Sequence, residues 1–232
     1  MTNQADFLKN LAIVRERINA ACVASGRDPA SVTLLPVTKT HPPEAAAVAY
    51  AAGLGAVGEN RVQEAAAKRP LSPAGLRWEL VGHLQGNKAT LAATVFDRVQ
   101  SLDSPQLAVR LARSLAAVGK VMPVLLQANT GGDTAKFGVA NFDALLHLCD
   151  EAFSSQWLNV EGVMTVPPLE STTGNGASRR AFARLREWRD ALETRFGRAL
   201  PILSMGMSGD IEDAVAEGST LVRVGTALFG TR

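Results

Sequence analysis

Short apolar runs alternate with helix-like stretches eight times along this chain, and this repetition restricts the fold more than any other feature. Parallel strands need crossover connections, and eight of them close into a barrel without exposed edges. We therefore predict a single-domain TIM (β/α)8 barrel spanning residues 1–232. A doubly wound open sheet is the competing architecture, but no glycine-rich dinucleotide-binding turn follows the first strand. The predicted strands are Val32–Lys39, Ala56–Asn60, Arg77–His83, Arg98–Leu102, Val121–Asn129, Leu158–Val166, Ile202–Met205 and Thr220–Gly225.

An extra amphipathic helix is predicted before the first strand. Phe7, Leu11, Val14 and Ile18 recur at spacings of three and four residues, so residues 1–26 should contain a helix that packs on the barrel. The segment Pro167–Ser178 is rich in proline, serine, threonine and glycine, which predicts a mobile loop after the sixth strand.

Charge and hydropathy narrow the class of protein. The 24 Lys and Arg residues against 22 Asp and Glu residues leave a formal charge of +2, and the basic residues are scattered, which argues against a nucleic-acid partner. No stretch reaches the roughly 18 uncharged apolar residues of a membrane helix, and charges interrupt the N-terminus, so we expect a cytoplasmic protein. Cys22 and Cys149 lack metal-type spacing and are expected to be reduced thiols, with no metal site.

Lys39 stands at the predicted C-terminal end of the first strand, where barrel proteins place their sites. Strand alternation puts Leu35, Val37 and Lys39 on one face, which brings the lysine into the barrel mouth. Burial there disfavours the charged ammonium, and a neutral amine can form a Schiff base with an aldehyde. Taken alone, the residue also fits a lysine that merely snorkels to solvent at a strand end.

Two turns of small residues follow the seventh and eighth strands, where barrels commonly hold phosphate. The first, SMGMSGD, leads into a helix near Asp210, and its small residues allow backbone amides to approach an anion closely. The second, RVGT, adds another set of amides. Tight turns with capping serines are the alternative interpretation. The candidate anion-binding residues are Ser204, Gly206, Ser208, Gly225 and Thr226.

Arg223 shares a strand face with Gly225, so its guanidinium should point into the same mouth as Lys39. A guanidinium stays protonated and can donate a hydrogen bond to a pyridine nitrogen, which weakens the ring as an electron sink. An ion pair within the barrel is the alternative role.

Four further polar residues have open or structural interpretations. His83 is either a pocket residue or a hydrogen-bonded structural residue. Lys136 is either a second anion contact or a solvated charge, and the solvated charge is slightly favoured. His147 is expected to pack within an apolar helix, and His41 to lie in a loop.

Five ordered segments end predicted strands: LLPVTKTHP around Lys39, VGENRVQE around Asn60, WELVGHLQGNK around His83, LSMGMSGD around Ser204 and LVRVGTALFG around Arg223. Over nearly the whole chain, this set resembles the pyridoxal phosphate homeostasis protein family. That family is related to the N-terminal barrel domain of bacterial alanine racemase, so the resemblance implies a barrel of PLP fold type III. Two positions depart from the family pattern. Threonine replaces the usual serine before the lysine, and Glu79 stands where histidine is common, which puts the packing of the third strand in doubt.

The resemblance implies a bound cofactor, pyridoxal 5'-phosphate (PLP), held as a Schiff base on Lys39. It also implies that Arg223 faces the pyridine nitrogen and that Asn60 lines the pocket. The phosphate would be held by nearby amides together with Ser204, Ser208, Gly225 and Thr226.

The function that the resemblance implies is PLP homeostasis: a monomer that buffers the cofactor or delivers it to PLP-dependent apo-enzymes, without efficient catalysis. A competing function, that of an amino-acid racemase, needs a second base, which the racemases take from a tyrosine of an added domain. The only tyrosine here is Tyr50, and the sequence ends at Arg232, soon after the eighth strand. Two more functions stay open: a Schiff-base aldolase that acts on a phosphorylated sugar through Lys39 or Lys136, and a partner-binding scaffold.

Overall fold

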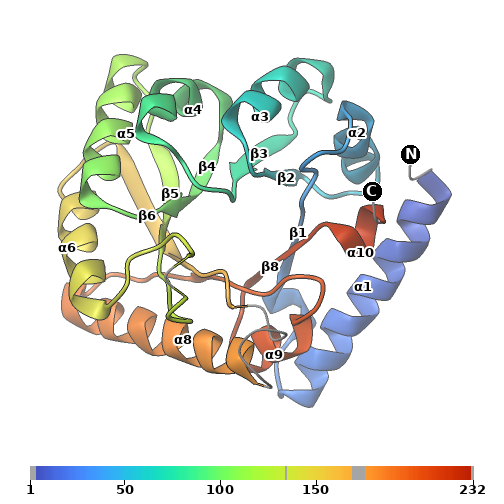
Figure 1. Ribbon diagram of the computed structural model, residues 1–232. Helices are drawn as coiled ribbons and strands as arrows, with labels where there is room; N and C mark the ends of the chain where they lie inside the picture. Colours follow the sequence, from blue (N-terminus) through green and yellow to red (C-terminus); the bar gives the residue numbers. More distant parts are fainter. Residues whose placement is uncertain (1–3, 134, 169–175, 231–232) are drawn as a thin grey trace.

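The computed structural model describes residues 4–133, 135–168 and 176–230 (Figure 1). Its eight strands are all parallel and follow the order β1-β8-β7-β6-β5-β4-β3-β2. A parallel bridge between Val37 and Gly58 joins the ends of this order and closes the barrel. The predicted barrel is therefore confirmed. The strands are β1 (Thr33–Pro36), β2 (Ala56–Glu59), β3 (Arg77–Leu80), β4 (Arg98–Leu102), β5 (Met122–Gln127), β6 (Leu158–Met164), β7 (Ile202–Ser204) and β8 (Leu221–Val224).

Helices surround the sheet (Figure 1). Ser104 caps one of them by accepting a hydrogen bond from the Leu107 N–H, with Pro105 in the first turn. A short helix follows the last strand, where the sequence predicted none. The helices are α1 (Gln4–Ala24), α2 (Pro43–Ala51), α3 (Val62–Lys68), α4 (Ala89–Val95), α5 (Pro105–Ala117), α6 (Phe142–Phe153), α8 (Ala177–Phe196), α9 (Ile211–Ala216) and α10 (Thr226–Phe229).

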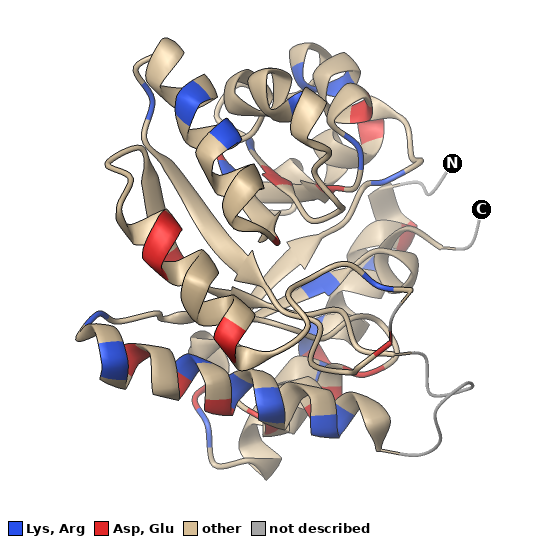
Figure 2. Cartoon of the chain, turned by 60° about the vertical axis from the view of Figure 1, so that its left-hand side comes forward, with Lys and Arg blue, Asp and Glu red and all other residues tan. Residues whose placement is uncertain are grey.

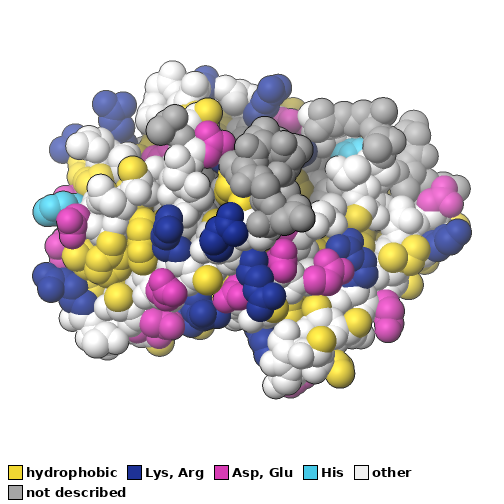
Figure 3. Space-filling model, turned by 60° about the horizontal axis from the view of Figure 1, so that its bottom comes forward, with side chains coloured by type: hydrophobic (Ala, Val, Ile, Leu, Met, Phe, Trp, Pro, Cys, Tyr) yellow, Lys and Arg dark blue, Asp and Glu magenta, His cyan; other side chains and the backbone are white. Residues whose placement is uncertain are grey.

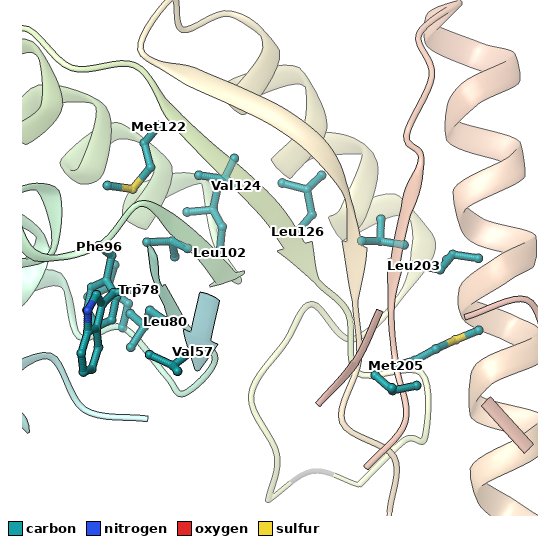
Figure 4. Close-up of a cluster of buried hydrophobic side chains, with 14 of the residues drawn as sticks. Val57, Trp78, Leu80, Phe96, Leu102, Met122, Val124, Leu126, Leu203 and Met205 are labelled. Atoms are coloured by element: carbon teal, nitrogen blue, oxygen red, sulfur yellow. The ribbon is translucent and has the colours of Figure 1, made fainter. Parts of the chain in front are cut away.

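The apolar core lies mainly between the sheet and the helices. Val57, Trp78, Leu80 and Phe96 lie together there and are fully buried (Figure 4). Burying a side chain of this size contributes about 1.5–3 kcal/mol relative to leaving it exposed. Because side chains alternate along a strand, Glu79, between Trp78 and Leu80, points to the opposite face, the barrel interior.

Helix α1 packs along one side of the barrel beside α9 and α10 (Figure 1). Its buried stripe includes the residues used to predict it. Its polar side chains also reach the turn after β7 and helix α10, which follows β8. Arg17 donates to the Ser208 carbonyl at 2.9 Å and pairs with Glu212, and Asn10 donates to the Leu228 carbonyl at 3.0 Å. Helix α1 therefore supports the turn after β7 and helix α10 from outside.

Charged residues are distributed rather than gathered. Lys and Arg lie among Asp and Glu along α8 (Figure 2), and the face formed by α8 and α9 shows the same mixture (Figure 3). Arg179 and Arg186 both pair there with Glu217. Among the described residues, no helix has the length and apolar character needed to cross a bilayer.

His147 is not a packing residue: it is exposed on α6, and the buried face of that helix is formed by Leu145, Leu148 and Cys149. The spacing of the apolar residues places His147 between them on the outer face. Most of the loop predicted at Pro167–Ser178 lies outside the described residues.

Candidate cofactor site

A cavity of about 310 Å³ opens at the C-terminal end of the barrel. Its lining residues lie at the ends of six of the strands, which is why segments far apart in sequence meet there. Of the residues predicted for the site, the structure brings together Lys39, Asn60, Ser208, Arg223, Gly225 and Thr226, with Val37, Val81, Val166, Met207 and Gly209 completing the lining.

A larger cavity of about 750 Å³ lies at the opposite end of the barrel, among the first residues of the strands. Thr33, Ala56, Arg77 and Leu221 are part of its lining. It contains none of the post-strand turns that bind ligands in this architecture, so we place the candidate site in the smaller cavity.

Lys39 is half-buried, and both of its neighbours are fixed in place. The Thr38 hydroxyl donates to Glu59 Oε1 at 2.8 Å, and the Thr40 N–H donates to Glu64 Oε1 at 2.5 Å. Thr40 has φ of 62°, a left-handed conformation that β-branched residues rarely adopt without support from their surroundings. The backbone that carries the lysine is therefore held by interactions outside the cavity.

Lys68, at the end of α3, is the centre of this support. Its ammonium donates to the Thr38 carbonyl at 2.8 Å, to Glu59 at 2.7 Å and to Glu64 at 2.6 Å. Lys68 is only 6% exposed and Glu59 is fully buried. Burial raises the pKa of Glu59, and the bonds from Lys68 and Thr38 oppose that rise. Lys68 was not predicted as part of the site; its four-residue separation from Glu64 on one helix was the available signal.

The turns after β7 and β8 form the other side of the cavity. The Ser208 hydroxyl accepts a hydrogen bond from the Ala227 N–H at 3.3 Å, so it links the two turns. Within the residues that the structure describes, the N–H groups of Ser208, Gly209 and Thr226 have no acceptor. Unpaired amides and hydroxyls on adjacent turns are the donor set that a phosphate requires.

Gly206 shapes the first turn without lining the cavity. Its φ is +100°, and a Cβ atom at this position would lie 2.6 Å from the Ala214 Cβ. Any larger residue would displace α9, so a glycine is required for the path of the chain.

Arg223 is 4% exposed and lines the cavity. It donates to the Ser204 hydroxyl at 2.6 Å and to the Thr165 carbonyl at 2.7 Å. Burial lowers the pKa of Arg223 to about 10, against the opposing charge of Asp210, so the group remains protonated at neutral pH.

Ser204 lies beneath Arg223 rather than in the cavity lining. Its hydroxyl donates to Gln100 Oε1 at 2.6 Å, and the Gln100 amide donates to Glu79 at 2.7 Å. Arg98 donates to the other oxygen of Glu79 at 2.8 Å. This series of hydrogen bonds inside the barrel fixes the position of Glu79 in β3. Gln100, which accepts the hydrogen bond from Ser204, was not predicted from the sequence.

The remaining polar residues lie beside the cavity. The His83 Nδ1 atom is 3.0 Å from Asp103 Oδ2, and its ring stacks on Phe137 with centroids 3.7 Å apart. The Lys136 ammonium donates to the Pro167 carbonyl, so the slightly favoured prediction of a solvated charge is wrong. Pro167 is 31 residues from Lys136 in the sequence, so no local sequence pattern could have indicated it as the partner.

Comparison with known proteins agrees with this geometry. The family model described as alanine racemase, N-terminal domain, matches residues 10–232. A pyridoxal phosphate homeostasis protein of Pseudomonas aeruginosa is 43% identical over 97% of this chain and 95% of its own length. The structure of PipY from Synechococcus elongatus with PLP bound superposes with a TM-score of 0.78 at 37% identity, over 94% of this chain and all of PipY.

A third comparison concerns the fold alone. An alanine racemase from Clostridium difficile superposes with a TM-score of 0.78 at 14% identity, over 98% of this chain and 57% of the racemase. A family model that covers nearly the whole chain, together with relatives of this identity and coverage, establishes the family. The chain belongs to the alanine racemase N-terminal domain family and, within it, to the pyridoxal phosphate homeostasis proteins.

Proposed function

We propose that this chain binds PLP in the cavity of about 310 Å³ and serves intracellular PLP homeostasis by buffering or delivering the cofactor. One observation carries the proposal: the cavity unites a primary amine, a buried guanidinium and two turns with unpaired amides. These are the three groups that an aldehyde, a pyridine ring and a phosphate require.

Each group has a separate role in this proposal. The cofactor supplies an aldehyde that condenses reversibly with a primary amine, and Lys39 presents that amine. Ser208, Thr226 and the neighbouring N–H groups bind the phosphate. Arg223 has five N–H donors, two of which are bonded to Ser204 and Thr165. A further donor directed at the pyridine nitrogen would keep that nitrogen unprotonated, which favours holding the cofactor over using it as an electron sink.

The composition of the cavity supports a carrier rather than a racemase. Racemisation needs a base on each face of the substrate carbon. The lining contains one amine, that of Lys39, and no histidine, tyrosine or carboxylate among the described residues. Tyr50 is on α2 and is not part of the lining.

Delivery requires that the cofactor can leave, and PLP-dependent apo-enzymes are its proposed recipients. We further propose that the chain acts as a monomer with an accessible cavity. Light scattering that gives twice the mass of one chain would contradict this part of the proposal.

Phosphate recognition by the two turns can be tested directly. The double substitution Ser208→Ala and Thr226→Val is expected to weaken PLP binding at least about tenfold, because it removes two hydroxyl donors to a charged acceptor. Binding of pyridoxal, which lacks the phosphate, should hardly change. Titration of the apo-protein with each aldehyde, followed by visible absorption, measures both affinities.

The control is Thr90→Val with Ser114→Ala, which removes an exposed hydroxyl pair between α4 and α5. It should bind PLP like the wild type. Equal losses of PLP and pyridoxal binding in the turn variant would show that these hydroxyls do not recognise the phosphate.

A further inference from the structure

A second cavity of about 330 Å³ adjoins the proposed cofactor cavity, and Asn60 lines both. The segments after β2 and β3 form the two walls of this second cavity and pack closely against each other. A Cβ atom on Gly82 would lie 2.3 Å from the Asn60 carbonyl oxygen, so only glycine allows the segments after β2 and β3 to approach this closely. The other lining residues are Arg61, Val62, Gln63, His83, Gln85 and Lys88.

This side cavity has an uncompensated positive charge. Arg61 and Lys88 both line it, and in the part of the chain that the structure describes neither side chain makes a hydrogen bond or an ion pair. Lys68, Arg98 and Arg223, in contrast, are bonded to protein acceptors. The nearby carboxylate of Asp103 is already bonded to His83. Two cations without partners in a concave surface attract a small anion.

The histidine adds an acceptor to these donors. Because His83 Nδ1 faces the Asp103 carboxylate, the proton of the neutral ring belongs on Nδ1, which leaves Nε2 as an acceptor. Stacking on Phe137 fixes the plane of the ring. The amide oxygens of Asn60, Gln63 and Gln85 are further acceptors on the same walls. The cavity therefore offers donors for a carboxylate and acceptors for an ammonium group.

We propose that the side cavity binds a small α-amino acid, with its carboxylate on Arg61 and Lys88 and its amino group toward Asn60 and the Lys39 cavity. The choice of an amine-bearing ligand rests on the proposed function, since an aldehyde cofactor on Lys39 reacts with amines. The carboxylate subsite does not depend on the cofactor. It can therefore be tested on protein from which any cofactor has been removed.

The experiment follows the histidine ring signals of the cofactor-free protein by NMR during titration with alanine, acetate and methylamine. Substitution His83→Gln identifies the signals of His83 among those of the 3 histidines. Alanine and acetate are expected to shift the His83 signals, with alanine binding more tightly, and methylamine alone should not. The double variant Arg61→Gln and Lys88→Gln should bind alanine about tenfold more weakly, because it loses two charge-assisted contacts.

The matched control is Lys9→Gln with Arg113→Gln, which removes the same charge from exposed positions on α1 and α5. It should bind alanine like the wild type. No shift of the His83 signals with alanine, or equal weakening in both double variants, would overturn the inference.

The same protein titrated with PLP alone separates this inference from the proposed function. PLP binding without alanine binding would remove the side-cavity assignment and leave the cofactor site. Alanine binding without PLP binding would remove the proposed function and leave the carboxylate subsite.

Discussion

Lys39→Ala is expected to abolish the visible absorption that PLP gives on the wild-type protein and to weaken PLP binding by at least about a hundredfold. The reason is chemical: among the described residues that line the cavity, Lys39 has the one primary amine, so none of the others can form a Schiff base with the aldehyde. The remaining phosphate and ring contacts should still give weak, colourless binding. Absorption spectra and equilibrium dialysis of the same samples measure the two effects.

Two further variants sharpen this test. Lys39→Arg keeps the positive charge but cannot condense with an aldehyde, so it should lose the absorption band as fully as Lys39→Ala. Lys136→Ala removes a neighbouring lysine whose ammonium is bonded to the Pro167 carbonyl, and it should keep the band. A band that persists in both Lys39 variants, and disappears in Lys136→Ala, would move the covalent site to Lys136.

Lys68→Met is expected to lower the free energy of unfolding by about 3–5 kcal/mol, the usual effect of removing one partner of a buried ion pair. The substitution leaves the fully buried Glu59 carboxylate without its ammonium partner and releases the Thr38 carbonyl. Urea unfolding of the wild type and the variant measures the difference.

The pH dependence of this loss has a definite sign. Burial already raises the pKa of Glu59, and without Lys68 that pKa should rise further. A carboxyl group whose folded-state pKa exceeds its unfolded value binds a proton on folding, so stability falls as pH rises through the folded-state pKa. The deficit of Lys68→Met should therefore be smaller in mildly acid solution than near neutrality.

Glu59→Gln added to Lys68→Met is the matched control. It removes the unpaired charge, so it should recover part of the lost stability and abolish the pH dependence of the deficit. An Lys68→Met variant as stable as the wild type at neutral pH would show that this cluster does not hold the Lys39 segment.

Much of the fold could be predicted because each strand-helix unit carries a local signal. Apolar runs and periodic helices identified eight units. Strand β4 has the predicted bounds, and the other seven strands are one to four residues shorter than predicted. Helix α10 has 4 residues, too few to show a helical period.

The candidate site was only partly accessible from the sequence. Residues at strand ends can be assigned to one end of a barrel, and the structure places Lys39, Asn60, Arg223 and Thr226 around one cavity. Whether a strand-end residue lines the cavity or lies under it depends on the residues that surround it in the folded protein. Ser204 ends a strand as expected, yet its hydroxyl lies between Arg223 and Gln100, which is 104 residues away in the chain.

The most direct test of the account is to load the protein with PLP, reduce it with borohydride, and identify the modified peptide by mass spectrometry. Reduction fixes a Schiff base as a stable secondary amine on the lysine that formed it. We predict one pyridoxyl group per chain, on the peptide that contains Lys39. Labelling of another lysine, or a protein that takes up no label after incubation with PLP, would contradict the central claim.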